Sequence, residues 1–346
     1  MIFFSHNLAR VFLLPKIGKN FMEINTARTN SAMKESPASE LSSLNPRLEV
    51  KSKIWSIGGG KGGVGKSMVT ANTAIMLAQM GYKVVAVDLD LGGANLHTCL
   101  GMGIPQKTLS DYISRQVSSL KEVVVPSPIE NLSIISGAQD EIGIANLKYL
   151  QKNKLLKNLN DLNADYILLD LGAGTSFNTL DFFITAHKGL LVVLPEPTSI
   201  ENTYRFIKSI FIRKIKMIDD FLEIQPLINK AMTAKIGTRQ SVPSEMIANV
   251  CQINPQLGQR LKDEISQLKF QIIMNQVRNK SEAEMGYSIQ TICKKYFGVQ
   301  VEYLGYLDYD QSAWQSVKKR RPVTQEFPHC NLSMSFKKLV AKLYSQ

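Results

Sequence analysis

The sequence of 346 residues has few cysteines and no long hydrophobic run. Its four cysteines, Cys99, Cys251, Cys293 and Cys330, are scattered, and none forms a C-x-x-C pair. This scatter argues against a cysteine-clustered metal or iron–sulfur site and suits a reducing cytoplasm. No stretch approaches the about 18 consecutive apolar residues that a membrane-spanning helix needs. We therefore expect a cytoplasmic protein that contacts the inner membrane at most peripherally.

Acidic residues are also in short supply. Asp and Glu number 29 against 41 Lys and Arg, which gives a formal net charge of +12. Such an excess raises the local concentration of polyanions, so it allows a nucleic-acid or anionic-membrane partner. The basic residues gather in two clusters, Arg205, Lys208, Arg213, Lys214 and Lys216 in one and Lys318 to Arg321 in the other. Both clusters are equally compatible with ordinary solvated faces.

The first 52 residues lack a sustained hydrophobic periodicity. Residues 1–20 contain a short apolar patch that Pro15 interrupts and no small-residue cleavage site, so we expect no signal peptide. Residues 21–52 are rich in Ser, Asn, Glu and Lys, a composition typical of a flexible segment. We therefore expect a flexible extension over residues 1–52, with Met22 or Met33 as alternative starts.

From Lys53 onward, short apolar runs alternate with helical patterns. This alternation predicts an α/β fold in one domain, residues 53–346, with a mostly parallel twisted sheet of about seven or eight strands and helices on both faces. The expected strands are 54–57, 84–88, 132–136, 166–171, 190–194, 270–275 and 301–307. The expected helices are about 67–80, 108–116, 145–160, 177–187, 198–216, 281–296 and 332–344. Residues 217–268 show no strand signal and are expected to form a helical insertion.

The sequence from Gly60 to Ser67 fits the phosphate-binding pattern G-x-x-x-x-G-K-[ST]. In this pattern glycines free backbone N–H groups to converge on phosphate oxygens, the lysine meets the terminal phosphates, and the hydroxyl binds Mg²⁺. The loop lies between an expected strand and an expected helix, whose N-terminus favours anions. We therefore predict a nucleotide site with Mg²⁺. Its nucleotide-binding residues are Gly60, Lys61, Gly62, Gly63, Val64, Gly65, Lys66, Ser67 and Met68.

Acidic residues follow two of the expected strands. Asp170 ends one of them, where a carboxylate could reach the Mg²⁺ shell or could cap a turn. Asp88 and Asp90 lie two residues apart, so in a regular strand both side chains point toward the ligand crevice at the carboxyl ends. A solvated acidic turn is the alternative for this pair.

Three segments together resemble the MinD/ParA family of ATPases, which carry a deviant Walker A motif. They are GKGGVGKS at 60–67, VVAVDLDLGGANL at 84–96 and YILLDLGAG at 166–174. The resemblance extends over roughly residues 53–345 and implies a P-loop NTPase fold. The amino-acid sequence around 84–96 and 170–202 is most similar to that of the flagellar number regulators of the family. Gly172 departs from the family, which often has Pro there, and the short N-terminal Asp-Gln-Ala-like motif of flagellar members is missing.

The resemblance also implies roles for individual residues. Lys61 would cross a two-fold interface to the partner's nucleotide, while Lys66 serves its own subunit and Asp90 orients the attacking water; these three are the expected catalytic residues. Asp88 would support the metal together with Ser67 and Asp170. Asn275, at the end of an expected strand, would read adenine, and its amide can both donate to and accept from a base edge.

The implied function is a slow ATPase switch, in which ATP joins two subunits as a homodimer and hydrolysis to ADP and phosphate releases them. It would regulate flagellum number or placement through flagellar or polar partner proteins. The alternative is a ParA-like partition ATPase that binds DNA non-specifically, which the net charge favours. An iron–sulfur carrier of the same family would need paired cysteines. The basic amphipathic helix expected at 332–344 could either contact the anionic inner membrane or pack in the core.

Overall fold

The computed structural model describes residues 52–90, 93–137, 149–222 and 243–345. All the described residues belong to one compact unit, Ser52–Gln346. The flexible extension expected at 1–52 therefore lies outside the described residues, apart from Ser52.

One eight-stranded sheet forms the centre of the domain, in the order β3-β4-β2-β5-β1-β6-β7-β8. Every neighbouring pair is parallel except β3 and β4, which are antiparallel. This sheet confirms the predicted fold class, and all seven expected strands are present. The eighth, β3, is a two-residue edge strand that the sequence did not predict. The strands are β1 (Lys53–Gly58), β2 (Val84–Leu89), β3 (Val125–Pro126), β4 (Leu132–Ile135), β5 (Tyr166–Leu171), β6 (Lys188–Val193), β7 (Lys269–Val277) and β8 (Gln300–Asp308).

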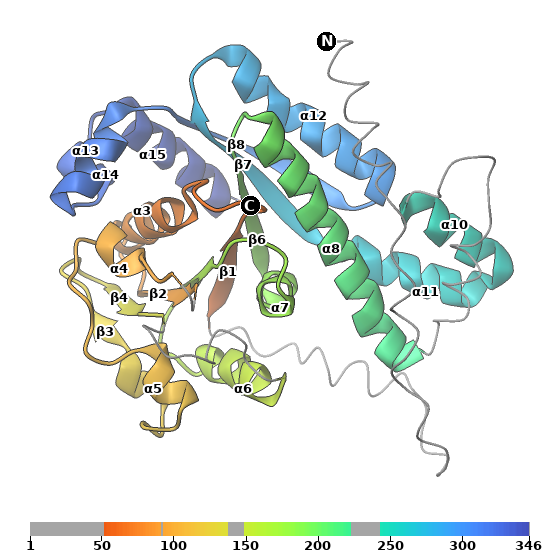
Figure 1. Ribbon diagram of the computed structural model, residues 1–346, viewed down its shortest axis with the longest axis horizontal. Coiled ribbons are helices and arrows are strands. Elements are labelled where there is room, and N and C mark those ends of the chain that lie inside the picture. The colour runs from red at the N-terminus through yellow and green to blue at the C-terminus, as the bar shows by residue number, and fades with distance from the viewer. Residues whose placement is uncertain (1–51, 91–92, 138–148, 223–242, 346) are drawn as a thin grey trace. The chain divides into compact units, whose positions relative to one another are not determined.

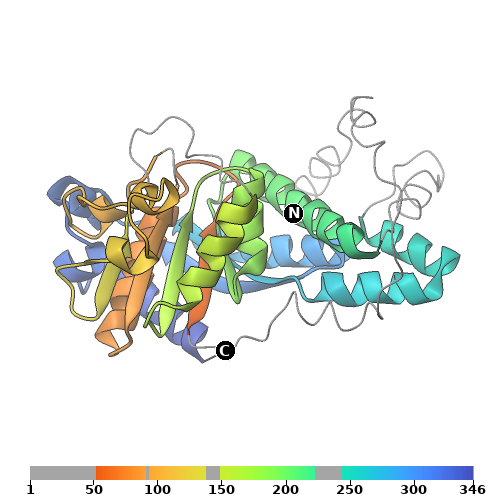
Figure 2. The same cartoon turned by 90° about the horizontal axis from the view of Figure 1, so that it is seen from below.

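Helices cover both faces of this sheet (Figure 1 and Figure 2). The short elements α4, η1 and α14, and the nine-residue α13, were not predicted. The helices are α3 (Lys66–Gln79), α4 (Leu96–Cys99), α5 (Leu109–Ile113), η1 (Leu120–Val123), α6 (Tyr149–Asn160), α7 (Phe177–Thr185), α8 (Pro197–Leu222), α10 (Pro243–Ile253), α11 (Pro255–Ser266), α12 (Lys280–Phe297), α13 (Gln311–Lys319), α14 (Val323–Glu326) and α15 (Asn331–Tyr344).

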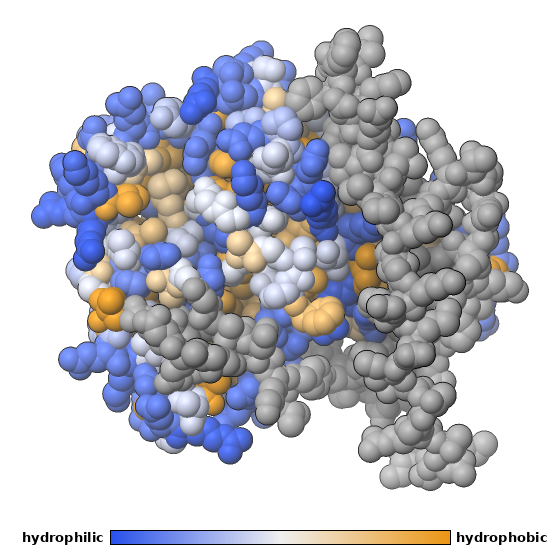
Figure 3. Space-filling model, in the orientation of Figure 1, coloured by the Kyte–Doolittle hydropathy of each residue, from blue (hydrophilic) through white to orange (hydrophobic). Residues whose placement is uncertain are grey.

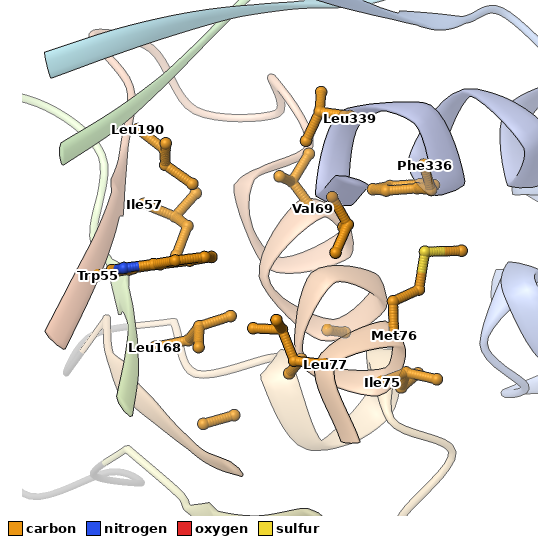
Figure 4. Close-up of a cluster of buried hydrophobic side chains, with 14 of the residues drawn as sticks. Trp55, Ile57, Val69, Ile75, Met76, Leu77, Leu168, Leu190, Phe336 and Leu339 are labelled. Atoms are coloured by element: carbon orange, nitrogen blue, oxygen red, sulfur yellow. The ribbon is translucent and has the colours of Figure 1, made fainter. Parts of the chain in front are cut away.

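The main hydrophobic core lies where α3 and α15 pack beside the sheet. Figure 4 shows Phe336 and Leu339 of α15 turned toward Val69 and Met76 of α3, with strand residues such as Trp55 on the opposite side. Because α3 directly follows the phosphate-binding loop, this packing fixes the helix whose N-terminus faces the site. A buried hydrogen bond adds to it, since the Thr324 hydroxyl of α14 donates to Asn72 Oδ1 of α3 over 2.8 Å.

The apolar stripe of α15 is buried. Leu332, Phe336, Leu339, Val340 and Leu343 are each exposed by 4% or less. Of the two alternatives for this helix, the structure therefore supports packing in the core, and the stripe is not free to enter a membrane. Among the described residues, no helix is long and apolar enough to span a bilayer.

On the opposite face, α7 and α8 pack on the sheet through aromatic rings, including an edge-on contact of Phe183 with Phe206. A buried charged group joins three helices there, because Asp181 of α7 pairs with Lys152 of α6 and with Arg213 of α8. Two hydrogen bonds of 2.6 and 2.9 Å connect Arg213 to the Asp181 carboxylate. This group holds α7 in place directly after the third motif.

The basic residues of the first cluster, between Arg205 and Lys216, have different surroundings. Arg213 pairs with Asp181, and Lys214 pairs with Glu264 of α11 over 2.8 Å. Arg205 and Lys208 are exposed on the outer side of α8. The cluster is therefore not one continuous cationic face, because two of its members stabilise helix packing instead.

The outer edge of β8 is closed by side chains from the helices on either side. Gln290 of α12 accepts a hydrogen bond from the Tyr303 N–H over 3.0 Å. Lys342 of α15 donates to the carbonyls of Tyr303 and Leu304 over 3.2 and 2.8 Å. These contacts occupy backbone groups that could otherwise pair with a strand from another chain.

Candidate nucleotide-binding site

The phosphate-binding loop connects β1 to α3 at the carboxyl edge of the parallel strands. Gly65 forms the N-cap of α3 with a φ of 93°, a left-handed conformation that suits glycine. No side chain caps the first turn of α3 and no acid lies in it. The free N–H groups and the helix dipole therefore favour an anion at this end. This geometry suits the binding of a phosphate group.

Lys66, in the first turn of α3, is buried, while Ser67 beside it is partly buried. The Thr70 hydroxyl, one turn further along, donates to the Lys66 carbonyl over 3.0 Å and to Asp170 Oδ1 over 3.2 Å. The loop lysine, the loop serine and the strand-end acid are thus brought to one place. Thr70 is an additional member that the sequence analysis did not identify.

Asp88 and Asp170 are direct register partners on the adjacent strands β2 and β5. Both are almost fully buried. Burial, and then the charge of Asp88, raise the pKa of Asp170 to about 7, although hydrogen bonds from Ser67 and Thr70 oppose the rise. Burial also raises the pKa of Asp88 to about 6, against backbone hydrogen bonds that lower it. Two carboxylates so close together in a dry site call for a cation.

The residues at this position fit a Mg²⁺ ion. Asp170 Oδ2 is buried and has no hydrogen-bond partner among the described residues, so one carboxylate oxygen can accept from a metal-bound water. No group of three or more His, Cys, Asp or Glu able to hold a metal occurs within the described ranges. Mg²⁺ does not need such a group, since it usually takes one or two carboxylates plus phosphate oxygens and waters. Ser67 and Asp170 would therefore hold it jointly with a nucleotide, with Asp88 beside Asp170 on the neighbouring strand.

Asp88 also holds the backbone of the following segment in place, a role that the sequence analysis did not predict. Its Oδ1 accepts from the Asp90 N–H over 3.1 Å and its Oδ2 from the Leu96 N–H over 3.0 Å. Both carboxylate oxygens therefore hold the segment that leads into α4. In this arrangement Asp88 is a support for the loop around Asp90, and any contact with a metal would be indirect.

Asp90 is partly exposed at the point where two motif segments meet. A Cβ placed on Gly172 would lie 3.3 Å from Asp90 Oδ1, and one placed on Gly93 would lie 3.7 Å from it. The carboxylate is therefore close to the segments after both β2 and β5. Leu91 and Gly92, which complete the loop, lie outside the described residues.

Lys61 differs from Lys66 in its surroundings. Its side chain is 42% exposed, and its ammonium group lies 3.7 Å from Glu196 Oε2 and 3.4 Å from Thr198 Oγ1, near the start of α8. A weak, exposed ion pair of this kind contributes little and is easily exchanged for another partner. The sequence analysis did not identify Glu196 and Thr198, although Glu196 comes shortly after the apolar strand β6.

Asn275 lies against the phosphate-binding loop. Its Nδ2 donates to the Val64 carbonyl over 2.8 Å, and its Oδ1 accepts from the Gln276 N–H over 2.9 Å. A Cβ on Gly65 would lie only 2.4 Å from Asn275 Nδ2. Gln276 has a φ of 59°, which is unusual for a residue other than glycine. The structure therefore brings Asn275 to the site, with its amide engaged by the backbone.

Comparisons with known proteins agree with this geometry. The model of the ParA family, described as NUBPL iron-transfer P-loop NTPase, matches residues 49–221. The antiactivator FleN of Pseudomonas aeruginosa is 27% identical over 296 residues, which cover 85% of this chain and 86% of FleN. The flagellum site-determining protein YlxH of Helicobacter pylori is 34% identical over 162 residues, 45% of this chain and 53% of YlxH.

A solved structure supports the fold. The septum site-determining protein MinD of Pyrococcus horikoshii, complexed with Mg-ADP, superimposes with a TM-score of 0.55 at 22% identity. The match covers 84% of this chain and 96% of that one. At this identity the likeness concerns the fold alone.

Proposed function

Because this chain belongs to the ParA/MinD family of P-loop ATPases, we propose that it is an ATP-dependent dimerising switch that regulates flagellum number or placement. ATP hydrolysis is the activity of the family, and the residues around the loop suit it. The homodimer, the role of each residue and the flagellar target belong to the proposal.

The contrast between the two loop lysines carries the proposal of a dimer. Lys66 is buried beside Asp170, where it can meet only the phosphates of its own subunit. Lys61 lies at the exposed rim with a weak ion pair, so it is available to the nucleotide of a second subunit. A lysine in each position supports a dimer whose population depends on bound ATP.

Within one subunit, the proposed chemistry depends on positioning and charge. Lys66 and the free N–H groups of α3 hold the phosphates, Asp90 orients a water, and Asn275 contacts adenine after giving up its bond to the loop. Mg²⁺, when bound at Ser67 and Asp170, neutralises charge on the phosphates. Asp88 keeps the Asp90 segment in position through its two backbone hydrogen bonds.

The flagellar target rests on the relatives. FleN is similar over most of this chain, and YlxH is named as a flagellum site-determining protein. The test is to delete the gene in the organism that encodes it and to count flagella by electron microscopy. The deletion strain is then complemented with the wild-type gene or with the Lys66→Ala variant. We expect an altered flagellar number or position that only the wild type restores. An unchanged flagellar pattern would overturn the proposed target.

A partition ATPase that binds DNA is the second candidate, and the net charge of +12 favours it. A mobility-shift assay with random-sequence DNA, with and without ATP, separates the two. Iron transfer, which the matching family description mentions, is not favoured by the cysteines. Burial raises the pKa of both Cys99 and Cys293 to about 12, so these thiols stay protonated and are poor metal ligands.

A further inference from the structure

Helix α13 exposes two large apolar side chains on one face. Trp314 is 68% exposed and Val317 is 53% exposed, and they lie three residues apart, so they are neighbours on the helix surface. Ser316 is buried on the inner side, which fixes the orientation of the helix. Neither side chain is part of the hydrophobic core or of the proposed nucleotide site. An exposed tryptophan beside an exposed valine needs a separate explanation.

Two cations at the end of α13 have no acidic partner among the described residues, and one of them lies over the Trp314 ring. The Lys318 ammonium lies 5.2 Å from the centre of the Trp314 ring, and Arg320 is exposed at the end of the helix. Lys319 and Arg321 both pair with Glu326, over 2.7 and 3.1 Å. Of the second basic cluster, Lys318 and Arg320 therefore keep an uncompensated charge among the described residues.

The wider surroundings are also basic. Residues 311–346 contain seven lysines and arginines, and Glu326 is their single acid. Lys337 and Lys338 are exposed on the neighbouring helix α15. In Figure 3, hydrophilic side chains line the outer edge near α13 and α14, at the upper left, beside a few hydrophobic ones. A partner for this surface must be anionic and must also accept apolar side chains.

We infer that α13 is a contact site for an anionic lipid surface. Tryptophan prefers the boundary between lipid headgroups and acyl chains, valine enters the apolar side of it, and lysine and arginine meet the headgroup phosphates. The phosphate backbone of duplex DNA would engage the cations but would offer nothing to Val317. The buried stripe of α15 cannot serve instead, and α13 supplies the two most exposed large apolar side chains among the described residues of the basic C-terminal part. This inference does not depend on the ATPase switch.

The chain contains its own reporter for the test, because it has only two tryptophans and Trp55 is 3% exposed. The Trp314→Phe variant gives the constant contribution of Trp55, and its subtraction leaves the emission of Trp314. The full-length protein is titrated with vesicles of equimolar phosphatidylcholine and phosphatidylglycerol, and with phosphatidylcholine vesicles alone, at low and high salt. The signal is local to α13, so binding through another segment does not imitate it.

We expect the Trp314 emission to shift to shorter wavelength and to become protected from iodide with the anionic vesicles, and less so at high salt. The double variant Lys318→Gln with Arg320→Asn should weaken partitioning by roughly 25-fold, about fivefold for each cation. Arg320 adopts a left-handed conformation that asparagine tolerates, so the fold is retained. The matched control Arg205→Gln with Lys208→Gln removes the same charge from the exposed side of α8 and should change partitioning by less than about twofold.

Three results would overturn the inference. One is an unchanged Trp314 emission with anionic vesicles at low salt. Another is an equal loss of binding in the α8 control, because net charge alone would then explain the contact. The third is a shift as large with single-stranded DNA or with polyglutamate as with vesicles, which would assign the surface to nucleic acid or to an acidic protein segment.

Discussion

At the scale of single residues, Gly65 packs tightly against Asn275 in the site. Gly65→Ala places a Cβ 2.4 Å from Asn275 Nδ2 and forces alanine into a φ of 93°. The left-handed conformation alone costs about 1–2 kcal/mol, so we expect ATP affinity to fall by roughly tenfold or more. Gly103→Ala is the control, since Gly103 lies outside the phosphate-binding loop and no described residue comes within 4 Å of its Cβ. Equilibrium binding of a fluorescent ATP analogue measures both, and equal affinities would contradict the geometry.

Asp90 provides a second prediction at this scale. Its carboxylate lies near Gly93 and Gly172, in the segments after β2 and β5, so its removal leaves Lys66 and the phosphate-binding loop in place. Asp90→Ala should bind Mg-ATP normally and hydrolyse it roughly 100-fold more slowly, because a positioned water is lost. Single-turnover hydrolysis at saturating ATP measures this rate. Reduced nucleotide affinity with an unchanged single-turnover rate would make Asp90 a binding residue.

At the scale of elements, α15 is part of the core and not a detachable anchor. Phe336→Ala should lower the free energy of unfolding by about 3–5 kcal/mol, because it removes a fully buried ring between α15 and α3. Met334→Ala on the same helix is the control, since Met334 is 42% exposed and should cost at most about 0.5 kcal/mol. Urea unfolding compares the two. Similar small losses in both variants would mean that α15 detaches readily.

The junction of β1 and β6 depends on pH through His187. The Ile54 N–H donates to His187 Nδ1 over 3.0 Å, which requires that this nitrogen be unprotonated. Burial lowers the pKa of His187, so the folded protein holds the proton less tightly than the unfolded chain. The contribution of His187 to stability is therefore complete above the ordinary histidine pKa of about 6.5 and declines as the pH falls below it.

Two carboxyl groups act in the opposite direction, because the raised pKa values of Asp170, about 7, and Asp88, about 6, favour the folded state as the pH falls from 7.5 to 5.5. The contribution of His187 is therefore measured as a difference between two proteins. Urea unfolding at pH 7.5 and pH 5.5 should show that acidification is less favourable to the stability of the wild type than to that of His187→Leu. A pH dependence that His187→Leu leaves unaltered would show that the hydrogen bond with Ile54 does not couple folding to protonation.

At the scale of the whole molecule, the sequence predicted what local patterns determine. The buried runs at 166–171 and 270–275 identify strands, and the glycines at 60–65 identify the loop. Contacts between distant segments were not predictable. Asn275 bonds to Val64 across 211 positions, and Arg213 bonds to an acid on another helix. The edge strand β3 was not predictable, because it exists only through the pairing of two residues with β4. Helix α13 was not predicted because Trp314 and Val317 face outward, which leaves it without an apolar periodicity toward the core.

The central claim is that the two loop lysines serve different subunits. Light scattering with ATP, combined with equilibrium ATP binding, tests it most directly on the wild type, Lys61→Ala, Lys66→Ala and the exposed-lysine control Lys208→Ala. The account predicts an ATP-dependent dimer for the wild type and the control, no ATP binding for Lys66→Ala, and a monomer that still binds ATP for Lys61→Ala. A Lys61→Ala protein that dimerises with ATP as the wild type does would contradict it.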